Sequence, residues 1–496
     1  MIRESLSDSL RSDTALATTI ALIAVRADEF ELNTTPLKPT IFVEELVRAL
    51  PGLETNYRRI ASVGHQLPIL MEAAPGPLLL ALERMLEGDG NVLKPLFDEV
   101  TELVAPASEH TPLLWGLESL AWDPRLLTRV CLILSKLDSI DPGGRLMNRP
   151  VNSLRTILLP WVPNTYATAS ERLAALDAVI TADEGAGWRL LQRLFPSSHD
   201  TSFPTFPPRY RSVGPEKREV LTNVIVWQFY EDIADRALQV AGDSADRWCS
   251  LIEAMSQFSP ASRARIAERL EAVLHGSHGA ERLSIWRVLQ DEVNRHLAFE
   301  GADWTLASDE IKRLRGLVER YPPGDFVEKN MWLFDDWMPN IPGIPVADLA
   351  EIKKVRVATL AGLDVKREAA VMLRLARDCK LPQFVADALA ELLADVVPFQ
   401  EYVAAALSEN NDKLLTFAMT LSGVANTRFG SAWKDWIAAL KGEDAISPEQ
   451  FARLAFPWDM NKDTWGFVQS MGVDYERKYW QVAWPHGAKG SAIPSF

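Results

Sequence analysis

Cysteine is scarce in this sequence, and so are long apolar runs. The 496 residues include only three cysteines, Cys131, Cys249 and Cys379, which lie far apart. An odd and scattered set predicts neither a disulfide framework nor a thiolate metal cluster, and it is typical of a reducing compartment. No apolar run approaches the roughly 18 to 20 residues that a helix needs to cross a bilayer. We therefore expect a cytoplasmic protein that does not associate with membranes.

Positive charge is also in short supply. The chain carries 52 Lys and Arg residues against 67 Asp and Glu residues, and its formal net charge at pH 7 is -15. Broad binding of nucleic acid depends on neutralising phosphates with Lys and Arg side chains. The charge balance therefore argues against a surface that binds nucleic acid broadly.

The common signatures of catalytic and cofactor sites are missing as well. The sequence has no glycine loop ending in Gly-Lys-Ser or Gly-Lys-Thr, no His-Glu-x-x-His, no Gly-x-Ser-x-Gly and no Cys-x-x-Cys. His275 and His278 flank a predicted helix end, and the sequence suggests no third ligand to complete a metal site. We therefore expect no cofactor, no metal and no enzyme activity.

One pair of carboxylates supports an alternative. Asp335 and Asp336 stand between two tryptophans in the run WLFDDW. Glycoside hydrolases place two carboxylates on opposite sides of a sugar bond, at least about 5 Å apart, whereas neighbours in sequence usually project apart. The acids are more typical of a helix end beside core aromatics. A toroidal α/α hydrolase that uses Asp335 or Asp336 stays an alternative.

Helical spacing of apolar residues is what the sequence has in abundance. Steps of three and four place each apolar set on one face of a helix. Such sets include Leu127, Val130, Leu134 and Leu137; Trp286, Leu289, Val293 and Leu297; and Val385, Leu389, Leu392 and Val396. Leu221–Tyr230 has a strand-like composition but lies inside a helical pattern that begins at Glu216. The spacing predicts an all-α protein.

Capping residues mark several of the predicted helices. A Ser or Asp before a proline places a capping side chain just ahead of the first helical position, where proline is well tolerated. Three pairs follow this pattern, Asp123-Pro124, Ser259-Pro260 and Ser447-Pro448. Gly276 is predicted to end the helix that Ser259 begins.

The length and the helices together predict the architecture. A chain of 496 residues exceeds what one compact core accommodates. Helical hairpins without strands form open α-solenoids or closed α/α toroids. We expect an α-solenoid of degenerate helical hairpins, similar to TPR or HEAT repeats, in one array or two. The expected parts are an N-terminal helical array over 1–109, a central array over 110–343 and a C-terminal array over 344–496.

Two long connections interrupt the helices of the central array, at 141–152 and at 196–215. They are rich in Pro or Gly, yet they carry basic and aromatic side chains, and aromatic residues favour an ordered loop. Fixed positive charge in an acidic protein suggests a docking site for an anion or an acidic partner. The same side chains are also suited to satisfying loop carbonyls and helix ends. The candidate partner-binding residues are Arg145, Asn148, Arg149, Asn152, Arg155, His199, Phe206, Arg209, Tyr210 and Arg211.

These loops also carry a family resemblance. The run from Trp115 to Thr165, the later run SSHDTSFPTFPPRYR and the run WLFDDWMPNIP resemble the helical region of large bacterial antiphage-defence proteins, including relatives of the STAND ATPases. The segment Glu476–Gly487 resembles a part of that family that leads into further helical repeats. The chain departs from the larger proteins because it has neither a nucleotide-binding signature nor a recognisable effector.

The resemblance implies a sensor or scaffold arm that recognises a phage component and relays that event to an effector. We therefore expect a recognition protein with a protein partner, and the sequence leaves open whether the chain also self-associates. A general assembly adaptor outside defence shares the same expected fold and differs only in its partner.

Overall fold

The computed structural model describes residues 2–26, 37–101, 106–215, 218–345, 348–365 and 367–483. Within these ranges the protein is helical, as predicted, with 25 α-helices. The exception is a short antiparallel pairing of β1 (Val100–Thr101) with β2 (Pro106–Ala107). The chain divides into two compact units, residues 1–273 and 274–496.

The first unit contains α1 (Ile2–Arg26), α2 (Pro39–Arg48), α3 (Tyr57–Ala61), α4 (Leu67–Ala73), α5 (Pro75–Met85), α6 (His110–Leu120), α7 (Pro124–Ile140), α8 (Pro150–Leu158), α9 (Ala169–Ala182), α10 (Glu184–Leu194), α11 (Asn223–Ala241), α12 (Ala245–Ala254) and most of α13 (Pro260–Gly276). Its short 3-10 turns are η2 (Gly64–Gln66), η3 (Lys94–Phe97) and η4 (Met255–Gln257).

The second unit contains α14 (Gly279–Ala298), α15 (Ser308–Arg320), α16 (Phe326–Asn330), η5 (Met331–Phe334), α17 (Leu349–Ala361), α18 (Ala369–Asp378), α19 (Pro382–Leu392), α20 (Val396–Ser408), α21 (Asp412–Phe429), α22 (Ser431–Gly442), α23 (Pro448–Ala455), α24 (Lys462–Ser470) and α25 (Val473–Val482). The boundaries predicted at 109/110 and 343/344 each lie inside one of the two units, and the division into three arrays stays a prediction.

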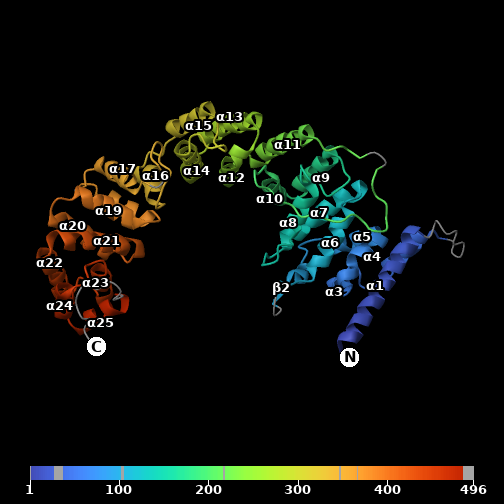
Figure 1. Ribbon diagram of the computed structural model, residues 1–496, viewed down its shortest axis with the longest axis horizontal. Helices are drawn as coiled ribbons and strands as arrows, with labels where there is room; N and C mark the ends of the chain where they lie inside the picture. The colour runs from blue at the N-terminus through green and yellow to red at the C-terminus, as the bar shows by residue number, and fades with distance from the viewer. Residues whose placement is uncertain are drawn as a thin grey trace. The chain divides into compact units, whose positions relative to one another are not determined.

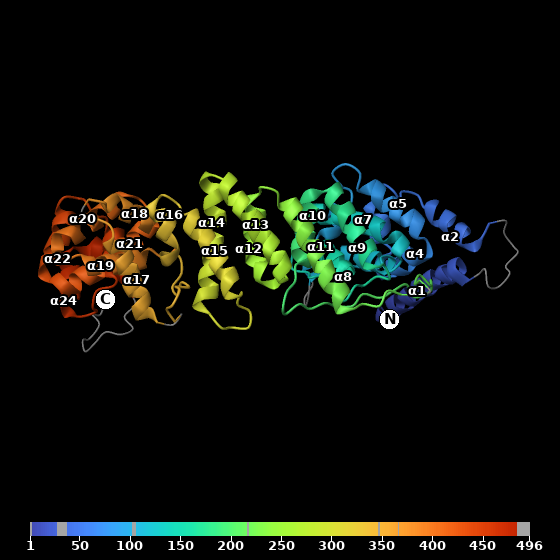
Figure 2. The same cartoon turned by 90° about the horizontal axis from the view of Figure 1, so that it is seen from above.

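Helices of the first unit pack mainly on helices one to three places along the chain. The closest pairs are α4 with α6, α7 with α9, α1 with α4, and α9 with α10. Figure 1 and Figure 2 show these helices side by side in approximate chain order. Because the packing is local, a long connection between two such helices runs over the surface of the unit.

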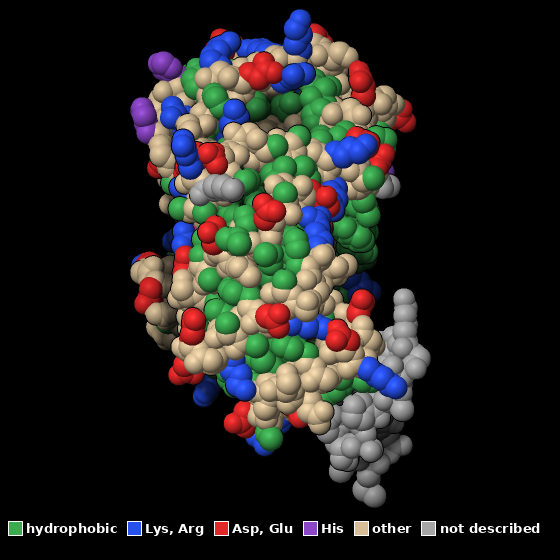
Figure 3. Space-filling view, turned by 90° about the vertical axis from the view of Figure 1, so that its left-hand side faces the viewer, with side chains coloured by type: hydrophobic (Ala, Val, Ile, Leu, Met, Phe, Trp, Pro, Cys, Tyr) green, Lys and Arg blue, Asp and Glu red, His purple; other side chains and the backbone are tan. Residues whose placement is uncertain are grey.

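The second unit has a similar local order. Each odd-numbered helix from α17 to α23 packs on the next odd-numbered helix. α18 packs on α19 and α21, and α20 packs on α21. On the face of this unit in Figure 3, hydrophobic side chains lie among scattered acidic and basic ones, a mixture that is normal for a folded protein's surface.

The predicted helix ends are confirmed. The Asp123 carboxylate accepts a hydrogen bond from the Arg125 N–H, and α7 begins at Pro124. The Ser447 hydroxyl and the Gln450 side chain form a reciprocal capping box at the start of α23. α13 runs from Pro260 to Gly276, as predicted.

One predicted start is wrong. Only residues 223–230 of the run Leu221–Tyr230 are helical, because the Thr222 hydroxyl accepts the Ile225 N–H and caps the helix at its start, Asn223. Residues 218–222 are not helical, and Glu216 lies outside the described residues. A local cap therefore sets the start of this helix, although the apolar pattern extends further.

Candidate functional site

The second long connection is tied to α4 by a buried carboxylate. Glu72 is only 3% exposed, and its carboxylate accepts three consecutive backbone N–H groups, from Arg209 at 2.8 Å and from Tyr210 and Arg211. The Arg211 guanidinium donates to the carbonyl oxygens of Glu72 and Ala73. Successive backbone N–H groups make an anion-binding concavity. Here the bound anion is a side chain of the protein itself.

The beginning of the same connection is held by an ion pair. Arg155 on α8 pairs with Asp200 and donates to the carbonyl oxygens of Arg193 at 3.1 Å and Thr201 at 3.2 Å. The other Asp200 oxygen accepts the indole N–H of Trp161 at 3.1 Å. Both oxygens of this carboxylate are therefore used, and Arg155 acts as a tie inside the protein.

A third tie lies between these two. The Thr205 N–H donates to the Asn164 side-chain oxygen at 2.9 Å, and the Thr205 hydroxyl accepts the Trp122 indole N–H at 3.0 Å. On either side of this tie, Phe203 is 84% exposed and Phe206 is 80% exposed. The connection is thus fastened at three points while two phenyl rings project from it.

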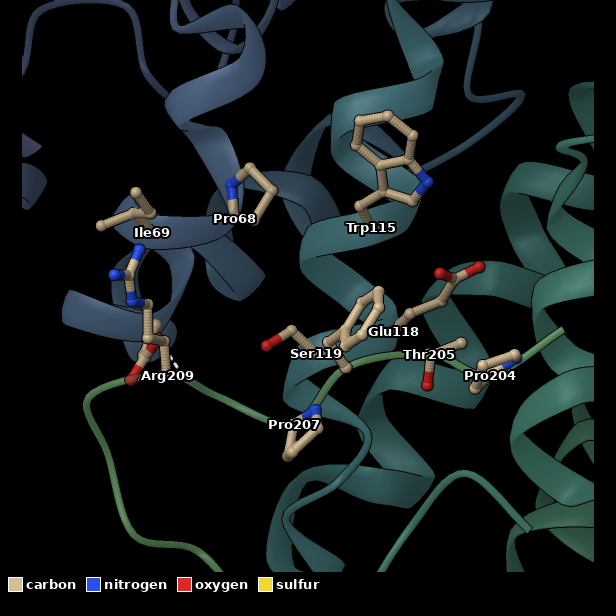
Figure 4. A pocket seen from close by; sticks show the side chains of 11 residues that line it. Pro68, Ile69, Trp115, Glu118, Ser119, Pro204, Thr205, Pro207 and Arg209 are labelled. Atoms are coloured by element: carbon tan, nitrogen blue, oxygen red, sulfur yellow. Dashed lines mark hydrogen bonds between the residues drawn. The ribbon is translucent and has the colours of Figure 1, made fainter. Parts of the chain in front are cut away.

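A cavity of about 450 Å³ lies between α4, α6 and this connection. Figure 4 shows Pro68 and Ile69 on one helix and Trp115, Glu118 and Ser119 on another, with the connection running past both. The lining consists of Pro68, Ile69, Glu72, Trp115, Glu118, Ser119, Pro204, Thr205, Phe206, Pro207 and Arg209.

Close packing of α4 on α6 places these side chains around one cavity. A Cβ added at Gly116 on α6 would lie 2.4 Å from the Met71 sulfur and 3.5 Å from the Pro68 Cα, so glycine leaves room for the Met71 side chain, while the backbone of α4 lies at ordinary contact distance. On the same helix Leu113 and Leu117 are fully buried, whereas Trp115 is 46% exposed. The helix period therefore turns the indole away from the core and onto the cavity.

The ionisable side chains of the cavity lining differ in whether they have partners within the protein. The Glu118 carboxyl accepts the Ser153 hydroxyl at 2.6 Å, and burial raises the pKa of Glu118. The Glu72 carboxylate accepts backbone N–H groups of the connection. The Arg209 guanidinium lies 5.4 Å from the centre of the Tyr210 ring and forms no ion pair with any residue that the structure describes. Arg209 therefore supplies an unpaired cation at the edge of an apolar cavity.

The first long connection has a different construction. Arg149 is buried and pairs with Glu99 and with Asp141, the latter at 3.0 Å, and it also donates to the Leu146 carbonyl oxygen at 3.1 Å. Backbone hydrogen bonds from Arg145 and Leu146 lower the pKa of Glu99. The guanidinium of Arg149 is thus enclosed by the connection and by Glu99, the residue just before β1.

The other candidate residues divide between ties and exposed positions. The Asn148 carbonyl oxygen lies 2.8 Å from the Nε2 of buried His110, which must carry the proton because a carbonyl only accepts. The Asn152 amide donates to the Met147 carbonyl oxygen at 2.7 Å. The side chains of His199 and Arg145 are exposed.

Comparisons of the chain with protein-family models, curated proteins and solved structures find no match. Among the residues that the structure describes, no group of three or more His, Cys, Asp and Glu side chains is placed to hold a metal ion. In the same ranges no helix has both the length and the apolar character needed to cross a membrane.

The structure thus brings together only part of the predicted site. Phe206 and Arg209 line the cavity, and the backbone of Tyr210 and Arg211 anchors the connection beside it. The cavity residues on α4 and α6 were not among those predicted from the sequence, although the position of Trp115 on its helix could have indicated one of them. An aromatic residue out of phase with the buried leucines of an amphipathic helix marks an exposed position.

The two carboxylates of the hydrolase alternative make structural hydrogen bonds. Asp335 accepts the Lys380 N–H at 2.7 Å, and Asp336 accepts the Met338 N–H at 3.1 Å. Buried Arg356 donates to the Asp336 carbonyl oxygen at 2.7 Å, which holds the same segment. These contacts fit the interpretation of the pair as acids at a helix end.

Proposed function

We propose that this protein is a recognition scaffold, an α-solenoid of degenerate helical hairpins, and that a protein partner binds at the cavity between α4, α6 and the 196–215 connection. The observation that carries the proposal is the exposed Phe206 ring at the rim of a cavity whose wall is fastened by Glu72, Asp200 and Thr205. The local packing of helices on their chain neighbours supports the solenoid.

An exposed ring on a fastened connection suits binding for a thermodynamic reason. Fully burying a phenylalanine side chain contributes about 1.5 to 3 kcal/mol. A wall that is already ordered loses little conformational entropy when the partner binds, so more of that contribution is retained. On a loop without such contacts, the entropy lost on ordering the loop would offset the free energy gained by burying the ring.

The biological role that we propose is sensing in bacterial antiphage defence, with a phage component or an effector subunit as the partner. This part of the proposal is supported by the resemblance of the runs from Trp115 to Thr165 and from Ser197 to Arg211 to defence proteins. Both runs contribute residues to the cavity. In the segment Glu476–Gly487, residues beyond 483 lie outside the described residues.

Affinity purification from infected and uninfected bacteria tests this role. We expect a partner that the wild-type protein captures, that Phe206→Asp loses and that Phe203→Asp retains. Phe203 is the matched control because it is equally exposed on the same connection but does not line the cavity.

Equal capture by all three proteins would contradict the proposed site. Capture of the same partner from infected and uninfected cells would exclude a phage component, and the identity of that host protein would then distinguish a defence effector from the partner of a general assembly adaptor.

A further inference from the structure

The lining of the cavity indicates what kind of partner segment it accepts. We propose, resting on the function proposed above, that the cavity binds a peptide segment in which a large apolar side chain stands next to an Asp or Glu carboxylate. The apolar side chain enters between α4, α6 and Phe206, and the carboxylate pairs with Arg209.

The apolar half of the proposal rests on the walls. Six of the lining residues are Pro68, Ile69, Trp115, Pro204, Phe206 and Pro207. Rings and a branched side chain lose little rotamer freedom when a ligand covers them. The volume of about 450 Å³ falls in the range of roughly 300 to 1,000 Å³ that is common for ligand pockets. The cavity can therefore accept a leucine, phenylalanine or tryptophan side chain.

The acidic half rests on charge complementarity. Of the three ionisable residues in the lining, Glu72 is satisfied by backbone N–H groups and Glu118 by the Ser153 hydroxyl. Arg209 has its guanidinium over the Tyr210 ring and no carboxylate partner in the described part of the chain. A guanidinium matches a carboxylate with two parallel hydrogen bonds. Figure 4 shows Arg209 beside Ile69 and well separated from Glu118 in that view. Glu72 lies at the same end as Arg209, but its carboxylate already accepts three backbone N–H groups, so the Arg209 guanidinium is the charged group left to pair with a ligand.

A basic partner segment is disfavoured by the same geometry. A Lys or Arg side chain at this end would face Arg209, and like charges brought together at an interface suppress binding. At the other end Glu118 already accepts a hydrogen bond and is largely removed from water. The cavity therefore discriminates by charge at one end only.

A synthetic peptide array tests the proposal with defined probes. Each heptapeptide has a Gly-Ser background and contains one apolar residue, which is Leu, Phe or Trp. It also contains one test residue, which is Asp, Glu, Asn, Gln or Lys, one to three positions from the apolar one. We expect the purified full-length protein to prefer peptides that pair an apolar residue with Asp or Glu. The best acidic peptide is then labelled with fluorescein, and its dissociation constant is measured by fluorescence polarisation.

Variants separate the two halves of the proposal. Arg209→Ala should raise the dissociation constant of the acidic peptide by about threefold to fivefold, the scale of an exposed ion pair. It should leave the affinity for the same peptide with Asn in place of Asp unchanged. Arg209→Glu should weaken the acidic peptide further and improve the Lys counterpart. Arg145→Ala is the matched control, since Arg145 is also exposed but lies on the other connection. The Arg209 variants keep the backbone N–H that Glu72 accepts, and circular dichroism checks that they stay folded.

The outcomes distinguish the two proposals. Apolar peptides that bind in a Phe206-dependent way, with no preference for acid and no effect of Arg209→Ala, would overturn the acidic preference and leave the proposed site intact. Peptide binding that is indifferent to Phe206→Asp would overturn the proposed site itself. Preference for Lys-containing peptides in the wild-type protein would overturn the charge argument.

Discussion

Removing the Glu72 side chain should release the wall of the cavity. In Glu72→Ala three backbone N–H groups, at Arg209, Tyr210 and Arg211, lose their shared acceptor. These hydrogen bonds are partly buried and their shared acceptor is a carboxylate, so the net contribution of a hydrogen bond to a charged group applies. At about 1.5 kcal/mol for each bond, the low end of the range for a charged acceptor, we expect a local loss of about 4 to 5 kcal/mol.

Hydrogen exchange is the appropriate assay, because a chain with two compact units does not unfold in one two-state step. A loss of about 4 to 5 kcal/mol corresponds to roughly a thousandfold faster exchange of the amides at 209–211, since each 1.4 kcal/mol is about tenfold. Peptides from α7 and α9 should exchange as in the wild-type protein.

Glu83→Ala is the control for this variant. Glu83 on α5 pairs with Arg129 and makes no hydrogen bond to the connection among the described residues. We expect its removal to leave exchange at 209–211 unchanged. If the amides of Glu72→Ala exchanged as slowly as those of the wild-type protein, the Glu72 carboxylate would not be what holds the connection, and the assignment of the wall would be wrong.

Two further predictions concern local stability and cysteine chemistry. Ser447→Ala should destabilise the start of α23 by about 1 kcal/mol, because it removes half of a capping box. Faster hydrogen exchange of the first amides of that helix would show this loss, and unchanged exchange would refute it. Burial raises the pKa of both Cys131 and Cys379 to about 12, so only a very small fraction of each thiol is in the reactive thiolate form between pH 7 and 9. Alkylation of these two cysteines, followed by mass spectrometry, should stay slow from pH 7 to 9 in the native protein and become fast in denaturant; rapid labelling in the native protein would contradict their burial.

Sequence alone determined the local features of this protein. Apolar residues at helical spacing, together with the caps at Asp123, Ser259 and Ser447, predicted helices that the structure confirms, because helix geometry and capping depend on residues within a few positions of each other. Trp286, with neighbours spaced by three and four, is buried as that pattern predicts.

Tertiary structure alone decided the partners of the basic connections. Glu72 lies 137 residues from Arg209 in sequence, and Glu99 lies 50 residues from Arg149, so no local spacing could pair them. Similar arginines consequently have different environments. Arg149 is enclosed by carboxylates, whereas Arg209 keeps its guanidinium unpaired at the cavity among the described residues. The sequence placed positive charge on two ordered connections, but only the packing of α4 against α6, in which the Met71 side chain lies over Gly116, decided where a cavity formed and which cation borders it.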